Sequence, residues 1–285
     1  MTLPPRLPIG VTLGPIGVDA AWWLDSARRL DEAGYAGIWC WDHFVSRGKK
    51  TTPVLEAWTI LTAAAAVTSR ATIGTFVANV MNRHPAVLAR MAATLQQVSG
   101  GRLVLGIGIG GGPAEHAAYG IPFPAPAERA THLEEAIATL RALWAGGPAT
   151  VPATIEGRFY ALDGAYAYPK PEPSVPILVG ARTPAGVRLA ARLGDGWAAE
   201  SDVFEALAPA YSEALADAGR SRAEQRVLVG FGSGRAGEDA LGGSPWVAEP
   251  HEEWDRWNAR GADEVTVTAR TTADVDALVK AVQRW

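Results

Sequence analysis

The sequence is most informative at residues 36–44, AGIWCWDHF, where an apolar run ends in an acid and an imidazole. Ala36–Cys40 is apolar and short enough to form a buried β-strand. Asp42 and His43 follow it after one further residue, Trp41. In α/β enzymes the residues at the carboxyl ends of the strands build the active site. The stretch therefore predicts a strand of a parallel sheet with titratable groups at its end.

Apolar runs of this kind recur along the chain and alternate with amphipathic helical segments, a pattern that predicts parallel strands joined by helices. We expect strands at Ile9–Leu13, Gly37–Trp41, Ala71–Val77, Leu103–Ile109, Ile177–Gly180, Gly196–Ala199, Val227–Phe231 and Glu264–Thr268. We expect helices at Ala20–Ala33, Glu56–Val67, Ala86–Val98, Ala130–Trp144, Ala185–Leu193, Glu205–Ala218, His251–Ala259 and Ala273–Gln283. Eight such units are what a (β/α)8 TIM barrel requires, whereas an open doubly wound sheet more often has about five or six strands.

The length of 285 residues agrees with one α/β barrel domain over residues 1–285. A proline-rich segment lies between the fourth helix and the fifth strand, at Gly146–Pro176. We expect it to form a short hairpin insertion with strand-like pieces at Ala153–Ile155 and Phe159–Leu162. Too few apolar residues remain there to bury a second core.

The composition and charge of the chain exclude some classes of protein. Hydrophobic residues make up 48% of the chain and charged residues 20%, and a net charge of −4 provides no basic field for nucleic acid or anionic lipid. Cys40 is the one cysteine, so no intrachain disulfide can form. The first residues lack the apolar core of a signal peptide, and no apolar run reaches membrane-spanning length. We expect a soluble, cytoplasmic protein.

Asp42 and His43 are neighbours at a strand end, so their side chains diverge and must serve different partners. We expect both to be catalytic. His43 would point into the barrel mouth as a proton donor, or as a hydrogen-bond donor to a bound ring, while Asp42 orients backbone or cofactor. The alternative is a capping aspartate beside a histidine that only packs.

A glycine-rich run, Leu105–Gly112, contains a G-x-G-x-x-G match after a predicted strand. A dinucleotide site would need a helix immediately afterwards. Pro113 and the prolines and glycine of 120–126 predict an irregular segment instead, so we expect these glycines to let a flat ligand approach the backbone. The alternative is tight packing between strands. A second match, Gly232–Gly237, runs into further glycines and is no stronger.

A phosphate site is predicted at Val179–Pro184, where a strand runs into a helix. Free amides at a helix N-terminus together with the guanidinium of Arg182 suit a phosphate. The alternative is an ordinary turn with an exposed arginine. The five histidines show no paired spacing, so we expect no metal site.

Taken in order, these features resemble the bacterial luciferase-like family of flavin and deazaflavin oxidoreductases. The resemblance rests on the segments Glu32–Trp39, Asp42–Phe44, His84–Arg90, Ser99–Gly108, Pro176–Gly180 and Gly194–Trp197. It covers most of residues 8–201, and the last third of the chain matches only in its alternation of strands and helices.

The family implies a (β/α)8 barrel with the cofactor ring lying across the carboxyl ends of the strands. Asp42 and His43 would then lie beside the ring, and Phe76-Val77 would form a bulge in the third strand that supports one ring face, often through a non-proline cis peptide. The family also implies contacts from Asn79 to the ring edge, from Gly108, Ile109 and Gly110 to the ring or its ribityl chain, and from Val179, Gly180 and Ala181 to the phosphate. The Asp-His-Phe pattern is typical of members that use the deazaflavin coenzyme F-420, with FMN as the alternative.

Two departures bear on the substrate. Where sugar-phosphate dehydrogenases of the deazaflavin branch have a catalytic glutamate, this chain has Gly111-Gly112, with Glu115 the nearest acid, and the tryptophan that follows their histidine is absent. We therefore expect hydride transfer to or from some other small organic substrate. The alternatives are an FMN-dependent monooxygenase served by a flavin reductase, and a non-catalytic flavin-binding barrel. We also expect a homodimer.

Overall fold

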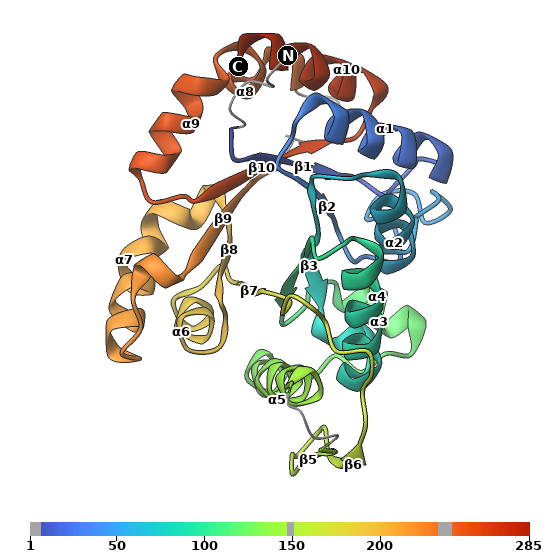
Figure 1. Cartoon of the computed structure of the whole chain (residues 1–285), viewed down its shortest axis with the longest axis vertical. Coiled ribbons are helices and arrows are strands. Elements are labelled where there is room, and N and C mark those ends of the chain that lie inside the picture. The colour runs from blue at the N-terminus through green and yellow to red at the C-terminus, as the bar shows by residue number, and fades with distance from the viewer. Residues whose placement is uncertain (1–6, 147–150, 233–240) are drawn as a thin grey trace.

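The computed structural model describes residues 7–146, 151–232 and 241–285. Eight parallel strands close into a barrel in the order β1-β10-β9-β8-β7-β4-β3-β2 (Figure 1). The strands are β1 (Ile9–Leu13), β2 (Gly37–Cys40), β3 (Thr72–Asn79), β4 (Leu103–Gly108), β7 (Ile177–Gly180), β8 (Gly196–Glu200), β9 (Arg226–Phe231) and β10 (Glu264–Ala269). The predicted (β/α)8 barrel is confirmed.

Helices follow the strands and surround the barrel (Figure 1). Those that match the predicted helices are α1 (Ala20–Ala33), α2 (Ala57–Val67), α3 (Pro85–Val98), α5 (Pro126–Trp144), α6 (Pro184–Leu193), α7 (Ser201–Asp217), α9 (Pro250–Ala259) and α10 (Thr272–Ala281). Most bounds lie within one or two residues of the predicted ones, and α5 and α7 begin four residues earlier. A short additional helix, α8 (Pro245–Ala248), precedes α9. Within the described ranges, none of the helices is long and apolar enough to cross a membrane.

The expected irregular segment after Gly112 is wrong for residues 113–119, whereas residues 121–125 have no regular structure, as expected. A helix, α4 (Pro113–Tyr119), begins directly after that glycine and ends before Gly120. Proline suits the first position of a helix, because its missing amide would have no partner there and its φ is already helical. Gly120, at φ 65°, closes the helix with the left-handed conformation common at C-termini. Pro113 and Gly120, two of the residues that predicted an irregular segment, are in fact the start and stop signals of this helix.

The predicted insertion is a two-stranded antiparallel hairpin, β5 (Ala153–Ile155) and β6 (Leu162–Ala165). The first strand is where the sequence predicts it, and the second begins later than the predicted Phe159. The amides of Phe159 and Tyr160 donate to the Glu135 carboxylate on α5, at 2.8 and 3.0 Å. They are therefore unavailable for pairing with β5.

The barrel interior is filled by a few large side chains that are accommodated by glycines. Trp39 on β2 points inward and is fully buried. A Cβ atom at Gly10 or Gly37 would lie 2.7 Å from the indole nitrogen, and one at Gly74 would overlap the ring. Glycines on β2 itself and on both adjacent strands thus leave the space that one tryptophan fills, as close packing requires.

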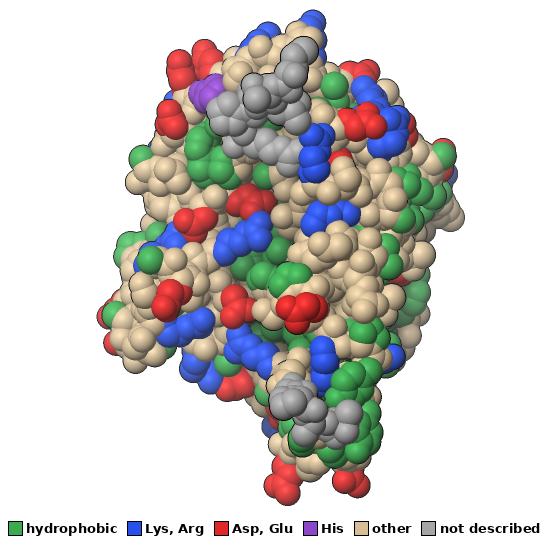
Figure 2. Space-filling model, in the orientation of Figure 1, with side chains coloured by type: hydrophobic (Ala, Val, Ile, Leu, Met, Phe, Trp, Pro, Cys, Tyr) green, Lys and Arg blue, Asp and Glu red, His purple; other side chains and the backbone are tan. Residues whose placement is uncertain are grey.

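At the amino-terminal end of the strands, the barrel is closed by an ion pair. Arg226 on β9 contacts the buried carboxylate of Glu264 on β10, with Nε donating to Oε2 at 3.0 Å. Burial raises the pKa of Glu264, and Arg226 offsets only part of that effect. Over the molecular face drawn in Figure 2, acidic and basic side chains are interspersed, in line with the near balance of 26 basic and 30 acidic residues.

Candidate active site

Strand β3 carries a bulge where the family resemblance implies one. Its register against β4 shifts between Thr75 and Ala78, and the Phe76–Val77 peptide is cis. Phe76 is buried in the barrel interior, whereas Val77 is only half-buried. The expected bulge and cis peptide are therefore confirmed, and the support of a cofactor ring by this bulge stays a prediction.

Three glycines surround the Val77 side chain. A Cβ atom would lie 3.1 Å from Val77 at Gly106, 3.2 Å at Gly108 and 2.8 Å at Gly180. At Gly106 it would also overlap the Thr75 carbonyl oxygen. The tight-packing interpretation therefore holds for these positions. Their second effect is to leave the ends of β4 and β7 as bare backbone around a single valine, which is a surface that suits a flat ring.

Gly110 has a different role. It has φ 80°, a conformation that favours glycine, and a Cβ there would overlap the side-chain amide of Asn79. Gly110 thus allows the chain to turn from β4 towards α4 while passing directly against Asn79. Ile109, between Gly108 and Gly110, is half-buried at the same turn.

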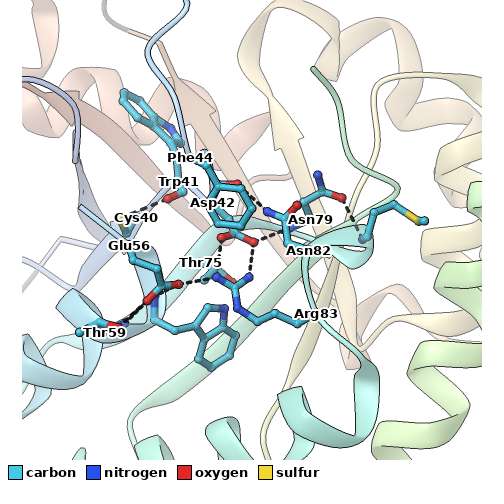
Figure 3. Close-up of polar contacts among 12 residues, drawn as sticks. Cys40, Trp41, Asp42, Phe44, Glu56, Thr59, Thr75, Asn79, Asn82 and Arg83 are labelled. Atoms are coloured by element: carbon cyan, nitrogen blue, oxygen red, sulfur yellow. Dashed lines mark hydrogen bonds and ion pairs between the residues drawn. The ribbon is translucent and has the colours of Figure 1, made fainter. Parts of the chain in front are cut away.

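Asp42 lies at the centre of a buried network (Figure 3). Its two carboxylate oxygens accept hydrogen bonds from the Arg83 guanidinium at 2.7 and 3.0 Å. Oδ2 also accepts one from the backbone amide of Asn79 at 3.0 Å. The side chain is 1% exposed. Arg83 also contacts Glu56, whose pKa is held below its ordinary value because hydrogen bonds from the start of α2 and the charge of Arg83 outweigh its burial. The Asp42 carboxylate thus contacts the Asn79 backbone, and its catalytic role stays a prediction.

His43 points to a different partner from Asp42, as predicted. Its Nδ1 lies 3.0 Å from Glu115 Oε2, and the other carboxylate oxygen accepts the Phe44 amide at 2.6 Å. Glu115 is buried on α4, while His43 is half-buried. A carboxylate at Nδ1 keeps the proton on that nitrogen and leaves Nε2 for another partner.

The next residue of α4, His116, holds the neighbouring strand end. Its Nε2 lies 2.7 Å from Asn79 Nδ2, and its ring packs on Phe123 with centroids 4.4 Å apart. Burial lowers the pKa of His116, which favours the neutral ring that can accept the amide proton. Asn79 Oδ1 accepts from the Met81 amide at 3.0 Å. Two consecutive residues of α4 thus fix His43 and Asn79.

The predicted phosphate site lies at the start of α6. Thr183 caps that helix by accepting the Gly186 amide, and the Ala181 amide donates to the Ala198 carbonyl oxygen at 3.3 Å. The exposed guanidinium of Arg182 donates to Asp202 at 2.7 Å. Arg182 is thus already ion-paired, and its contact with a phosphate stays a prediction, as does that of Val179–Ala181.

Glu200 was missed by the sequence analysis. It ends β8 and has the inward parity of Gly196 and Ala198, so it faces the barrel mouth. Burial raises its pKa, and the nearby Arg182 counteracts only part of this. The signal was the one that revealed His43, a titratable residue directly after a predicted strand. Arg83, Glu56 and His116 had no comparable signal, because their roles depend on contacts between separate elements.

In the part of the chain that the structure describes, no group of three or more histidine, cysteine, aspartate or glutamate side chains is arranged to hold a metal ion. The described groups at the barrel mouth include the His43 imidazole beside buried Glu115, the inward carboxyl group of Glu200, and exposed backbone around Val77.

Comparison with known sequences identifies the family. Residues 6–233 match the profile of the luciferase-like monooxygenases. An F-420-dependent glucose-6-phosphate dehydrogenase of Beutenbergia cavernae is 36% identical over 208 residues, which are 70% of this chain and 60% of that protein. Its counterpart in Microbacterium testaceum is 35% identical over 212 residues, or 72% and 62% of the two chains. The chain thus matches about three fifths of the length of these relatives.

Solved structures share the fold. An F-420-dependent secondary alcohol dehydrogenase, bound to an F-420–acetone adduct, superposes with a TM-score of 0.81 at 21% identity, covering 98% of this chain and 99% of the other. EDTA monooxygenase from Chelativorans sp. BNC1 superposes with a TM-score of 0.75 at 17% identity, covering 98% and 94%. At these identities the likeness concerns the barrel and not the reaction.

Proposed function

The chain belongs to the luciferase-like monooxygenase family, and from this premise we propose that it is an oxidoreductase that binds a flavin-type ring over the mouth of its barrel. The observation that carries the proposal is the pair formed by His43 and buried Glu115, 3.0 Å apart at the end of β2. A storage barrel has no need for an imidazole held in this way towards the mouth.

The residues present fit such a ring. The glycines at 106, 108 and 180 leave a flat shelf on which Val77 is the projecting side chain. We propose the deazaflavin coenzyme F-420 as the cofactor, supported by the Asp42-His43-Phe44 pattern and by the names of the relatives. Contacts to it would come from Val77, Asn79, Gly108–Gly110 and Val179–Arg182.

When bound, F-420 supplies or accepts a hydride at its ring. The protein's part is to position the substrate and to move the accompanying proton. An imidazole nitrogen can donate or accept a proton, so His43 Nε2 can give a proton to a substrate heteroatom or take one from it. Glu115 stabilises the charged imidazole of His43 and holds its orientation. The Asp42–Arg83 network fixes the backbone at His43 and Asn79.

The cofactor is tested by titrating the purified protein with F-420 and with FMN, following the absorption and fluorescence of each. Saturable binding of F-420 supports the proposal, and strong binding of NAD with neither ring cofactor bound would contradict it.

The role of His43 is tested with His43→Asn. Reduction of bound F-420 is measured against a panel of small alcohols and other hydride donors. We expect a rate lower by about 10²–10⁴, with cofactor affinity and thermal unfolding close to wild type. His251→Asn, an exposed histidine on α9, is the matched control. Normal turnover by His43→Asn would show that His43 is not the proton donor or acceptor. Absence of turnover by the wild type with every donor would favour the non-catalytic barrel.

A second candidate is an FMN-dependent monooxygenase, favoured by the description of the family that matches residues 6–233. It would need reduced FMN from a partner reductase. Oxygen consumption by the protein loaded with reduced FMN, measured in the presence of substrate, separates it from a hydride-transferring enzyme. We also propose that the protein is a homodimer, which light scattering of the purified chain tests.

A further inference from the structure

The mouth of the barrel has a second side that the proposed function does not use. The closed strand order places β1 diametrically opposite β7, so the ends of β10, β1 and β2 face the predicted cofactor phosphate site across the barrel. Arg270 follows β10, and Trp41 follows β2. Arg270 lies beyond residues 6–233, the part of the chain that the family profile matches.

Both side chains face the mouth. On β10, Thr266 points inward and its hydroxyl meets that of Thr12 on β1 at 2.9 Å, so Arg270, four residues later, has the same parity. Trp41, the first residue after β2, has the parity of the inward Trp39. Gly14, after β1, lies between them: a Cβ there would be 3.2 Å from the Trp41 ring and 3.3 Å from Arg270 Cγ. In Figure 3, Trp41 points away from the Asp42 network.

The Arg270 guanidinium lies over the indole, with Cζ 5.0 Å from the ring centroid. Such stacking is attractive and leaves the N–H edge of the guanidinium available to an oxyanion. Two other arginines near the mouth, Arg83 and Arg182, are paired with carboxylates, and a third, Arg129, packs on the Phe123 ring next to His116. Among the described residues, no carboxylate lies within ion-pair distance of Arg270, and its side chain is exposed.

We propose that Arg270, stacked on Trp41, binds an oxyanion of the substrate, either a carboxylate or a phosphate. The guanidinium offers two parallel donors to such a group. The inference rests on the proposed function and deepens it: the substrate carries a negative charge at the end remote from the reacting carbon, and this charge is held across the mouth from the cofactor phosphate.

The test is isothermal titration of the F-420-loaded protein with inorganic phosphate and, separately, with succinate, at constant ionic strength. We expect saturable one-to-one binding of one of them by the wild type, and the anion that binds tells which oxyanion the site takes. Arg270→Gln should weaken this binding by about tenfold or more, because a charge-assisted bidentate contact is lost. Trp41→Leu, which removes the stacking face, should weaken it by roughly two- to fivefold.

Arg28→Gln is the control, since Arg28 pairs with Asp25 and Glu32 on the surface of α1 and should leave anion binding unchanged. Equal binding by wild type and Arg270→Gln, or no saturable binding by the wild type, would overturn the inference. A variant that loses F-420 affinity instead of anion affinity would also overturn it, because Arg270 would then contact the cofactor. If the wild type binds neither F-420 nor FMN, the proposed function fails, and the same comparison on the cofactor-free protein decides the Arg270 site separately.

Discussion

Trp39, on β2, and Trp41, which follows that strand, are two residues apart, yet they belong to two different regions of the barrel. Trp39 lies towards the amino-terminal end, where strand glycines make room for it and the Arg226–Glu264 pair closes the barrel. Trp41 lies at the carboxyl-terminal end, half-buried under the Arg270 guanidinium. One end of this barrel is thus filled with packed side chains, and the other keeps polar groups accessible.

The largest expected effect is that of Trp39→Ala. It would leave a cavity that the surrounding backbone cannot fill, because the neighbouring strands carry glycine at the contact positions. We expect a loss of about 3–5 kcal/mol in the free energy of unfolding, measured by urea denaturation. Trp41→Ala is the matched control and should cost about 1 kcal/mol or less. Equal losses for the two variants would show that the two ends do not differ in this way.

The next effect concerns buried charge at the mouth. Arg83→Met would leave the carboxylate of Asp42, which is 1% exposed, without its cation. We expect destabilisation of about 3 kcal/mol in urea denaturation, because an unpaired buried charge costs more than the pair contributes. Asp42→Asn with Arg83→Met together should be less harmful than Arg83→Met alone. If the double variant is the less stable one, the network is not governed by the Asp42 charge.

The ion pair at the opposite end predicts a pH dependence. Burial raises the pKa of Glu264 in the folded protein above its unfolded value, so the folded state binds this proton more tightly. The resulting stability is present below the unfolded pKa and is lost as pH rises through the folded pKa. Glu264→Gln removes this dependence. The free energy of unfolding of the variant and of the wild type is measured at a series of pH values. We expect the variant to become more stable relative to the wild type as pH rises from acidic to neutral. A difference in stability that does not change with pH would contradict the raised pKa.

The smallest effect on stability is expected for Arg182→Gln. Arg182 is more than half exposed, and its contact with Asp202 is a surface ion pair. We expect a change of about 0.5 kcal/mol or less in thermal unfolding. Weaker F-420 binding by this variant, in the same titration as for the wild type, would show that Arg182 contributes to cofactor binding and not to the stability of the barrel. Unchanged affinity would make Arg182 a surface residue.

The barrel could be predicted from the sequence because each strand and helix has its own local pattern. The end of β2 could be found in the same way, since Asp42 and His43 directly follow an apolar run. The partners of these residues could not be found. Arg83 reaches Asp42 from the segment before α3. Glu115 reaches His43 from α4, a helix that the surrounding glycines and prolines made difficult to predict. Such contacts depend on how distant segments pack, which no local pattern contains.

Helix α4 has a consequence for how the site responds to substitution. Glu115 and His116 are adjacent in one short helix, and each holds a residue of a different strand end, His43 and Asn79. A shift of the helix that loosens one contact also loosens the other. His43 and Asn79 therefore form one thermodynamic unit, in which the free-energy effects of single substitutions are not additive and only a double-mutant cycle can separate their contributions.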